Sequence, residues 1–351
     1  MSTRSLRQLQ RLLSRSTLST CPSAAPIVKT APIASRIRSI SEQIKPFSTT
    51  KMQSAQNNPD FKLDKLFDVK DRVVVITGGG SGIGLMATQA FAVNGAKVYI
   101  IGRTKEKLET VANEYSKGIS GQIIPIQGDI SKKDEIARLY EEIKKREKCV
   151  CVLVNNAGIS SNTLQTEASS AEEMKKNLFD NSDANFEDWV DTYRTNVPQC
   201  YFMTTAFLPL LQASSDHHHG YSGCVINVCS ISGIVKTAQH HFAYNSSKAA
   251  VIHLTKMLGW EIANNGLKIR VNSLAPGVFP SEMTAGGESG DNQKSEIPKE
   301  NFDCKVPANR PGRDVDMAQG MVYLAANQYV NGQTIVIDGG YVLKTGSASS
   351  G

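Results

Sequence analysis

The chain has 351 residues, of which 40% are hydrophobic and 21% are charged, a composition typical of a globular protein with at least one large core. No run approaches the roughly 18 consecutive apolar residues that a membrane-spanning helix needs, so we expect a soluble protein. The seven cysteines show neither CxxC nor CxH spacing, which argues against a disulfide framework and a zinc site and favours a reducing compartment.

The net charge of +6 is concentrated near the N-terminus. Residues 1–50 hold eight of the 39 basic groups and one of the 33 acidic groups, which leaves the remainder with 31 basic and 32 acidic groups. The body of the protein is therefore nearly neutral, and its sequence lacks the pattern of basic and aromatic residues that is typical of nucleic-acid binding. We expect no nucleic-acid partner.

Residues 1–50 are rich in Ser, Thr and Arg, as targeting segments are. On a helix their first leucines and arginines segregate to opposite sides, which resembles a mitochondrial presequence. These are Leu6, Leu9, Leu12 and Leu13 on one side and Arg4, Arg7, Arg11 and Arg15 on the other. The alternatives are a disordered basic tail, or an internal start at Met52 that yields a cytoplasmic form.

From residue 71 onward, short β-rich runs alternate with helical runs, the pattern of a parallel sheet with crossover helices. We predict one Rossmann-type, doubly wound α/β domain over 68–345, with a seven-stranded parallel sheet flanked by helices. A linker at 51–67 precedes it and a disordered tail at 346–351 follows. The first helices are expected at 82–93, 105–115 and 132–147, and the strands at 72–77, 96–101, 122–126, 149–154, 223–228, 268–274 and 333–338.

Two polar stretches, 160–185 and 281–305, are too long for ordinary connections. We expect them to be surface insertions or a lid.

A glycine-rich turn follows the first predicted strand and precedes the first helix. In "TGGGSGIG", Gly78, Gly82 and Gly84 are spaced so that backbone amides and a helix N-terminus can approach a pyrophosphate. Because the turn lies between a strand and a helix, it indicates a dinucleotide site rather than a merely flexible connection.

Further motifs follow at the ends of later strands: "GDI", "NNAG", a serine after the fifth strand, and Tyr-x-x-x-Lys. Together with TGxxxGxG they resemble the short-chain dehydrogenase/reductase family over about residues 68–343, a match that extends to "APGVFPSEM" and "NGQTIVIDGG". The resemblance implies a nicotinamide cofactor, a small-molecule carbonyl or alcohol substrate, and a homotetramer or homodimer.

Tyr244 and Lys248 are four residues apart, one turn along the same face of a helix. A carbonyl that accepts hydride needs a proton donor, and a phenol with an ordinary pKa of about 10 is poorly matched to neutral pH. An ammonium one turn away favours the phenolate, so Lys248 would make Tyr244 a better acid. The alternative is a surface Tyr/Lys pair.

The resemblance assigns two further catalytic positions. Ser230 in "NVCSISG" is the predicted donor to the substrate oxygen, with Ser232 as its competitor. Asn196, on a long helix before the fifth strand, matches the asparagine that holds a proton-relay water; its alternative is a structural amide.

Cofactor contacts follow from the same resemblance. It places Ser81 and Ile83, with Gly78 and Gly84, at the pyrophosphate; Asp129 and Ile130 at the adenine; Asn156, Ala157 and Gly158 near the ribose; Tyr244 and Lys248 at the nicotinamide ribose; and Gly277, Phe279 and Ser281 at the carboxamide. Asn155 is interpreted as structural.

The end of the second strand predicts NADP(H), with NAD(H) as the less favoured cofactor. An NAD-selective site places a carboxylate there to accept from the ribose hydroxyls. Here Gly102 leaves room without negative charge, and Arg103 follows with a planar donor fork suited to phosphate. The alternative is an Arg103 side chain that points into solvent.

No metal site is expected from the histidines. His217, His218 and His219 are too close together in sequence for an ordinary closed site, and His240 and His241 precede Tyr244, where they could contact substrate. The cysteines at 149, 151 and 229 are interpreted as core residues.

The sequence therefore predicts an NADP(H)-dependent oxidoreductase that interconverts a ketone and a secondary alcohol, with Tyr244 as the acid/base. The chain is similar to 3-oxoacyl-thioester reductases and fungal ketoreductases, so a 3-oxoacyl thioester and a secondary-metabolite intermediate are both candidate substrates. The alternative is a catalytically silent cofactor-binding scaffold or redox sensor.

Overall fold

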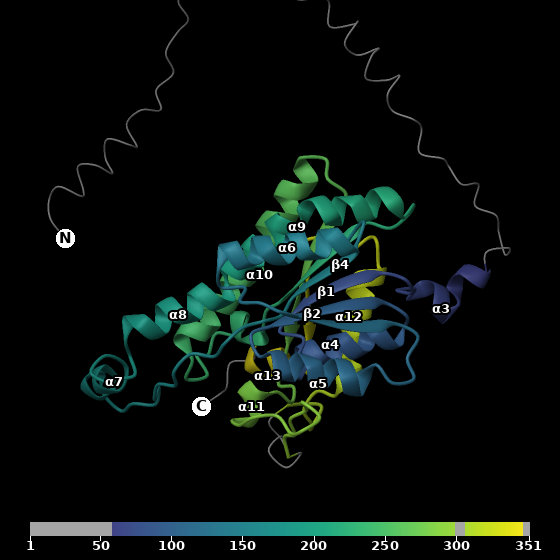
Figure 1. The fold of residues 1–351 in the computed structure, drawn as a ribbon. Helices are drawn as coiled ribbons and strands as arrows, with labels where there is room; N and C mark the ends of the chain where they lie inside the picture. The colour runs from purple at the N-terminus through teal and green to yellow at the C-terminus, as the bar shows by residue number, and fades with distance from the viewer. Residues whose placement is uncertain (1–57, 299–305, 347–351) are drawn as a thin grey trace, which may run out of the picture. The chain divides into compact units, whose positions relative to one another are not determined.

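The computed structural model describes residues 58–298 and 306–346 (Figure 1). The predicted targeting segment at 1–50, the first part of the predicted linker and the predicted tail from 347 onward lie outside the described residues. Mitochondrial import, the domain boundaries and the homo-oligomeric state stay predictions. Within the described ranges, no helix is both long enough and apolar enough to cross a bilayer.

Seven parallel strands form the single sheet that organises the described residues, in the order β3-β2-β1-β4-β5-β6-β7. This confirms the predicted Rossmann-type fold. The order reverses between β1 and β4, which leaves a crevice beyond their carboxyl ends. The strands are β1 (Val73–Thr77), β2 (Lys97–Gly102), β3 (Gln122–Gln127), β4 (Val152–Asn155), β5 (Gly223–Val228), β6 (Ile269–Pro276) and β7 (Thr334–Ile337).

Helices cover both faces of the sheet, so that it is buried on each side (Figure 1). In β1, Val74 and Ile76 pack into one hydrophobic core while Val73 and Val75 pack into the other, which is why the strand reads as a continuous apolar run. One face is covered by α4 (Gly82–Val93), α5 (Lys105–Tyr115) and α12 (Asp314–Ala326), and the other by α6 (Lys133–Arg146), α9 (Pro198–His217) and α10 (Phe242–Asn264).

The remaining helices are peripheral. Both predicted insertions lie at the surface in their described parts, since α7 and α11, which they contain, bury no residue. The peripheral elements are η1 (Asn58–Phe61), α3 (Leu63–Leu66), α7 (Ala171–Leu178), α8 (Phe186–Asn196), η2 (Ile231–Gly233), α11 (Glu282–Ala285) and α13 (Tyr341–Gly346).

Several predicted elements differ from the structure by one or two residues at an end, and two differ by more. The helix expected to carry Asn196 is divided, because α8 ends at Asn196 and α9 begins at Pro198, whose missing N–H suits the first turn of a new helix. Strand β4 begins at Val152 rather than Cys149, although the Cys151 amide already donates to Val73 O at 2.8 Å. The cysteine side chains at 149, 151 and 229 are buried, as predicted.

The glycine-rich turn depends on one very close approach between β1 and α4. Gly78 has φ +67°, a left-handed conformation that suits glycine, and its carbonyl oxygen faces the first turn of α4. A Cβ placed on Gly84 would lie 1.9 Å from Gly78 O, a backbone atom that cannot rotate away. Gly84 is therefore needed for packing of the helix against the turn.

We predict that Gly84→Ala lowers the free energy of unfolding by about 1–3 kcal/mol, because the helix must move away from the turn. Urea unfolding measures the change. Gly287→Ala is the matched control, since a Cβ at Gly287 meets no atom within 4 Å, and its effect should stay within about 0.5 kcal/mol. An unfolding midpoint of the Gly84 variant equal to that of the parent would contradict the steric argument.

Asp316 fixes the N-terminus of α12 through a forked contact. Its carboxylate accepts from Arg310 Nη1 at 2.6 Å and from the Arg313 amide at 2.9 Å. The hydrogen bond from Arg310 lowers the pKa of Asp316 and outweighs burial, which raises it. The net result is a pKa lowered from 3.8 to about 2. The ionised form is therefore favoured by folding, and its contribution is complete above pH 4 and is lost as the pH falls toward 2.

We predict that Asp316→Asn costs about 1–2 kcal/mol of unfolding free energy at pH 7, a range reduced for the partial exposure of both arginines. Because the parent loses its carboxylate in acid, the difference should shrink below pH 4. Denaturant unfolding from pH 7 to pH 3 checks this, with the exposed Asp291→Asn as control. A difference independent of pH would show that the ion pair is not its source.

Candidate active site

A cavity of about 450 Å³ runs along the carboxyl edge of the sheet. Its wall is made by the loops that follow β1 to β6, which come together there because all strands point the same way. Most of the residues predicted as cofactor or catalytic residues line it. They are Gly78, Ser81, Ile83, Arg103, Asp129, Ile130, Asn156, Ala157, Gly158, Ser230, Tyr244, Lys248, Gly277, Phe279 and Ser281.

At the glycine-rich end, Asn156 ties the loop after β4 to the turn after β1. Its Nδ2 donates to Thr77 O at 3.0 Å and to Gly78 O at 3.2 Å, while its amide donates to Thr77 Oγ1 at 3.0 Å. The first-turn amides of α4 lack intrahelical partners, and the N-cap residue Ser81 makes no side-chain cap bond to them. This turn therefore fits a phosphate group. Gly84 does not line the cavity; the structure gives it the packing role described above, and its predicted contact with the pyrophosphate stays a prediction.

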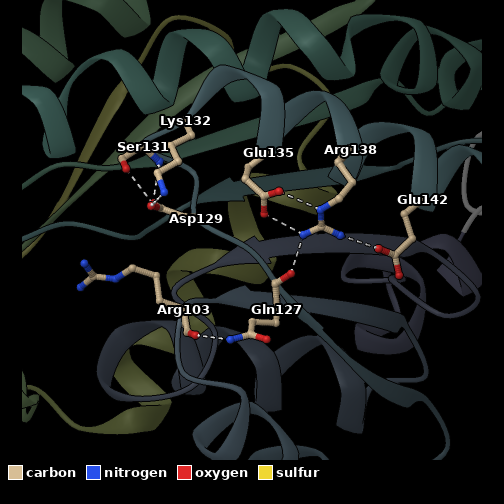
Figure 2. A network of polar contacts seen from close by, with 8 residues as sticks. All are labelled: Arg103, Gln127, Asp129, Ser131, Lys132, Glu135, Arg138 and Glu142. Carbon is tan, nitrogen blue, oxygen red and sulfur yellow. Dashed lines mark hydrogen bonds and ion pairs between the residues drawn. The ribbon is translucent and has the colours of Figure 1, made fainter.

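Arg103 lies at the rim of the same cavity, directly after Gly102. Its carbonyl accepts from Gln127 Nε2 at 2.8 Å, and Figure 2 shows the side chain extending away from that contact. No residue in the described ranges forms a hydrogen bond or ion pair with its guanidinium. The side chain is exposed, so this position is compatible both with the predicted recognition of a phosphate and with the alternative of an arginine that points into solvent.

Asp129 is held as a carboxylate on the neighbouring loop (Figure 2). It accepts from the Ser131 hydroxyl at 2.7 Å and the Ser131 amide at 3.1 Å. These hydrogen bonds, with the nearby Lys132, lower the pKa of Asp129 below its usual value. The loop is thus ordered by its own side chains before any ligand binds.

An ion pair that the sequence did not predict lies at this end of the cavity. Lys107 Nζ lies 2.6 Å from Glu282 Oε1, which joins α5 to α11, and both residues line the cavity. Burial raises the pKa of Glu282, but Lys107 and Ser289 outweigh it, so the net pKa is lowered. The position of Lys107, one turn after Arg103, was the available signal; its partner 175 residues away gave none.

At the other end, Ser230, Tyr244 and Lys248 share one stretch of wall. Lys248 is 4% exposed, and its Nζ donates to Val228 O at 3.2 Å and lies 5.5 Å from the centroid of the Tyr244 ring. Ser230 Oγ accepts from the Ser232 amide at 3.1 Å. The competitor Ser232 instead donates its hydroxyl to Gln239 Oε1 at 2.8 Å and does not line the cavity.

Asn196 lies behind this wall rather than on it. Its carboxamide pairs with the Ile159 backbone at 2.9 and 3.0 Å and donates to Ser247 Oγ at 3.0 Å. Its Oδ1 and Lys248 Nζ both border Gly158, at 3.0 and 3.4 Å from a Cβ placed there. These contacts are those expected of the structural alternative, an amide that ties Ile159 to Ser247. The predicted relay water stays a prediction.

Other predicted positions have structural contacts. Asn155 is buried and donates to Asn227 Oδ1 at 2.8 Å, in agreement with its structural interpretation. His240 and His241 place Nδ1 against Leu164 O at 3.0 Å and Ser161 O at 3.2 Å, so they tie the insertion to the segment before Tyr244. Neither histidine lines the cavity. Unpredicted wall residues include Thr104, Thr195, Met283 and Thr284.

Comparisons with known proteins agree with this geometry. The family model described as short chain dehydrogenase matches residues 72–292. The short-chain dehydrogenase/reductase PhomF of Diaporthe leptostromiformis is 40% identical over 302 residues, covering 84% of this chain and 99% of the relative. The rhamnolipids biosynthesis 3-oxoacyl-[acyl-carrier-protein] reductase of Pseudomonas aeruginosa is 32% identical over 280 residues, covering 79% and 98%.

Among solved structures, the Pseudomonas aeruginosa RhlG/NADP active-site complex is similar with a TM-score of 0.65 and 30% identity, covering 79% of this chain and 98% of that one. Fold, cavity and sequence relatives therefore lead to the same conclusion: the chain belongs to the short-chain dehydrogenase/reductase family and is an oxidoreductase that acts on CH–OH or carbonyl groups.

Proposed function

We propose that the protein is an NADP(H)-dependent ketoreductase that interconverts a ketone and a secondary alcohol. The observation that carries the proposal is the position of Ser230, Tyr244 and Lys248 on one wall of a cavity whose other end carries Arg103. When bound, the nicotinamide supplies or accepts the hydride. The alternative of a silent cofactor-binding scaffold has no observation in its favour, since all three groups are present and face the same space.

The chain's own residues have distinct tasks in this proposal. The Tyr244 hydroxyl donates the proton to the oxygen of the reduced carbonyl, and the Ser230 hydroxyl donates a hydrogen bond to the same oxygen as negative charge develops. Lys248 is held by Val228 O beside the Tyr244 ring, so its ammonium favours the phenolate that remains after proton transfer. The neighbouring ribose hydroxyls are its proposed acceptors.

The substrate class is proposed from the relatives. The Pseudomonas relative is named for reduction of a 3-oxoacyl group on a carrier protein, and the fungal relative by its family alone. A 3-oxoacyl thioester is the first candidate, and a ketone of secondary metabolism is the second. Both present a carbonyl that Tyr244 and Ser230 could polarise.

We predict that Tyr244→Phe lowers kcat about 10²- to 10⁴-fold on a 3-oxoacyl thioester or any active ketone, because only the proton donor is lost. The dissociation constant for NADPH should remain within a factor of a few of the parent's value. Lys248→Ala should weaken both turnover and NADPH binding. Steady-state assays measure kcat, and NADPH fluorescence titrations measure the dissociation constant.

The fully exposed Tyr329 supplies the control, and Tyr329→Phe should leave both quantities unchanged. A Tyr244→Phe enzyme with near-parental turnover would refute the assigned acid. If Lys248→Ala binds NADPH as tightly as the parent, Lys248 does not contact the ribose, and the rest of the proposal is unaffected.

We further predict a 10- to 150-fold preference for NADPH over NADH in kcat/KM, corresponding to about 1.5–3 kcal/mol for a hydrogen bond between Arg103 and a charged phosphate. Arg103→Ala should reduce the preference, and Gly102→Asp should shift it toward NADH because a carboxylate repels the 2′-phosphate. Lys105→Ala is the matched control, since Lys105 is exposed and does not line the cavity. Equal use of both cofactors by the parent would show that this loop does not read the phosphate.

A further inference from the structure

A second cluster of reactive side chains lies at the opposite edge of the sheet from the cavity. Cys149 and Cys151 precede β4, and His218 is the C-cap residue of α9, directly before the connection to β5. Because all strands are parallel, the segments that enter them gather at the amino edge, whereas the cavity lies at the carboxyl edge. The cluster is therefore separate from the site described above.

The three side chains bring their donor atoms close together. The two Sγ atoms and a ring nitrogen of His218 all lie within 4.8 Å of one another, and Cys149 Sγ is 3.8 Å from His218 Nε2. Zinc bonds of about 2.3 Å to sulfur and about 2.0–2.1 Å to nitrogen, at tetrahedral angles, separate such atoms by roughly 3.6–3.8 Å. The 3.8 Å between Cys149 Sγ and His218 Nε2 is already close to that spacing.

The backbone around the cluster is fixed on both sides. Val150 donates to Leu210 O of α9 at 3.0 Å, and Cys151 donates to Val73 O of β1 at 2.8 Å. The His218 amide donates to Ser214 O at 2.9 Å and its carbonyl accepts from Tyr221 at 2.9 Å. Two separate segments are thus preorganised against each other, which lowers the entropic cost of binding a shared ion.

The donor atoms of the cluster are those that a borderline-soft dication prefers, namely two cysteine sulfurs and one imidazole nitrogen. Binding of a dication releases the thiol protons to solvent and forms two metal–sulfur bonds and one metal–nitrogen bond.

Polar groups beside the cluster lack partners of their own. Tyr221 Oη and Arg72 Nε are buried without a hydrogen-bond partner in the described ranges, and the Arg72 guanidinium lies 4.3 Å from the centroid of the Tyr221 ring. The Tyr221 and His218 rings are in edge contact, with centroids 6.4 Å apart. The unpartnered Tyr221 hydroxyl is a polar neighbour for a metal-bound water, whereas the positive charge of Arg72 opposes the binding of a dication.

We propose that Cys149, Cys151 and His218 form a zinc site, completed by water, that fastens the end of α9 to the beginning of β4. Thiolate and imidazole ligands favour zinc among the common divalent ions, and tetrahedral coordination accepts three protein ligands and one water. No metal was expected from the sequence, because the cysteines lack CxxC and CxH spacing and the three adjacent histidines are too close together for an ordinary closed site; Cys149 and His218 are 69 positions apart. Only the fold brings them together.

Cobalt(II) titration of the reduced, chelator-treated full-length protein tests the proposal. We expect one equivalent to bind with the visible absorption of tetrahedral cobalt and a thiolate-to-cobalt charge-transfer band, and zinc to displace it and to raise the Tm. Absence of a charge-transfer band would overturn the proposal. A second outcome would also overturn it. If the mass of the protein before reduction is two hydrogens lower than that of the reduced protein, with no metal bound, Cys149 and Cys151 form a disulfide instead.

Three variants locate the site: Cys149→Ser, Cys151→Ser and His218→Gln. Each should weaken zinc binding by more than about 100-fold, because the loss of a residue that only supports a metal ligand costs at most about that much. His217→Gln and Cys224→Ala are matched controls that should bind zinc as the parent does. NADPH affinity, measured on the same samples, should be unchanged in all five, which verifies folding independently of metal. Parental zinc affinity in His218→Gln, or equal loss in the controls, would refute the site.

Discussion

The parallel direction of all seven strands is the constraint on which the active site depends. Each loop that contributes to the cavity follows the carboxyl end of a strand, so residues more than 200 positions apart in sequence, such as Gly78 and Phe279, face one space. A single antiparallel strand would carry its loop to the other edge. The sheet can be all-parallel because helices cover both of its faces. Its central strands β1, β4 and β5 accordingly contribute apolar side chains to the cores on both sides.

Within that frame, short-range contacts set the shape of the nucleotide end. The approach of Gly84 to Gly78 O allows α4 to begin close behind β1, and the Asn156 carboxamide donates hydrogen bonds to the same turn. Asp129 and its partners order the adjacent loop in the same way. Because these groups bond to one another in the free protein, little ordering is left to be done when a ligand binds.

Sequence patterns predicted those features that depend on local order. The alternation of strands and helices gave the fold class, and helix α5 agrees with its predicted bounds because its apolar spacing and its flanking turns are both local signals. The motif residues lined the cavity for the same reason: each is fixed relative to the end of its own strand.

Features that depend on contacts between distant segments were not accessible. The pairing of Lys107 with Glu282, the position of Asn196 behind the wall, and the approach of His218 to two cysteines arise only after the sheet has assembled. Gly84 illustrates a subtler limit, since the motif marks it as essential but does not distinguish contact with a ligand from contact with Gly78.

The burial of Lys248 has a cost for the stability of the fold. An ammonium that is 4% exposed loses most of its hydration, and among the described residues Val228 O accepts one of its three hydrogens. Such a charge destabilises the folded state unless further acceptors reach it, so the hydrophobic packing on both faces of the sheet has to offset it. The same burial keeps the ammonium beside Tyr244 and out of bulk water, and an electrostatic effect on the Tyr244 oxygen is strong only where water is excluded. The proposed reaction therefore offers a reason for the position of Lys248 that the stability of the fold does not.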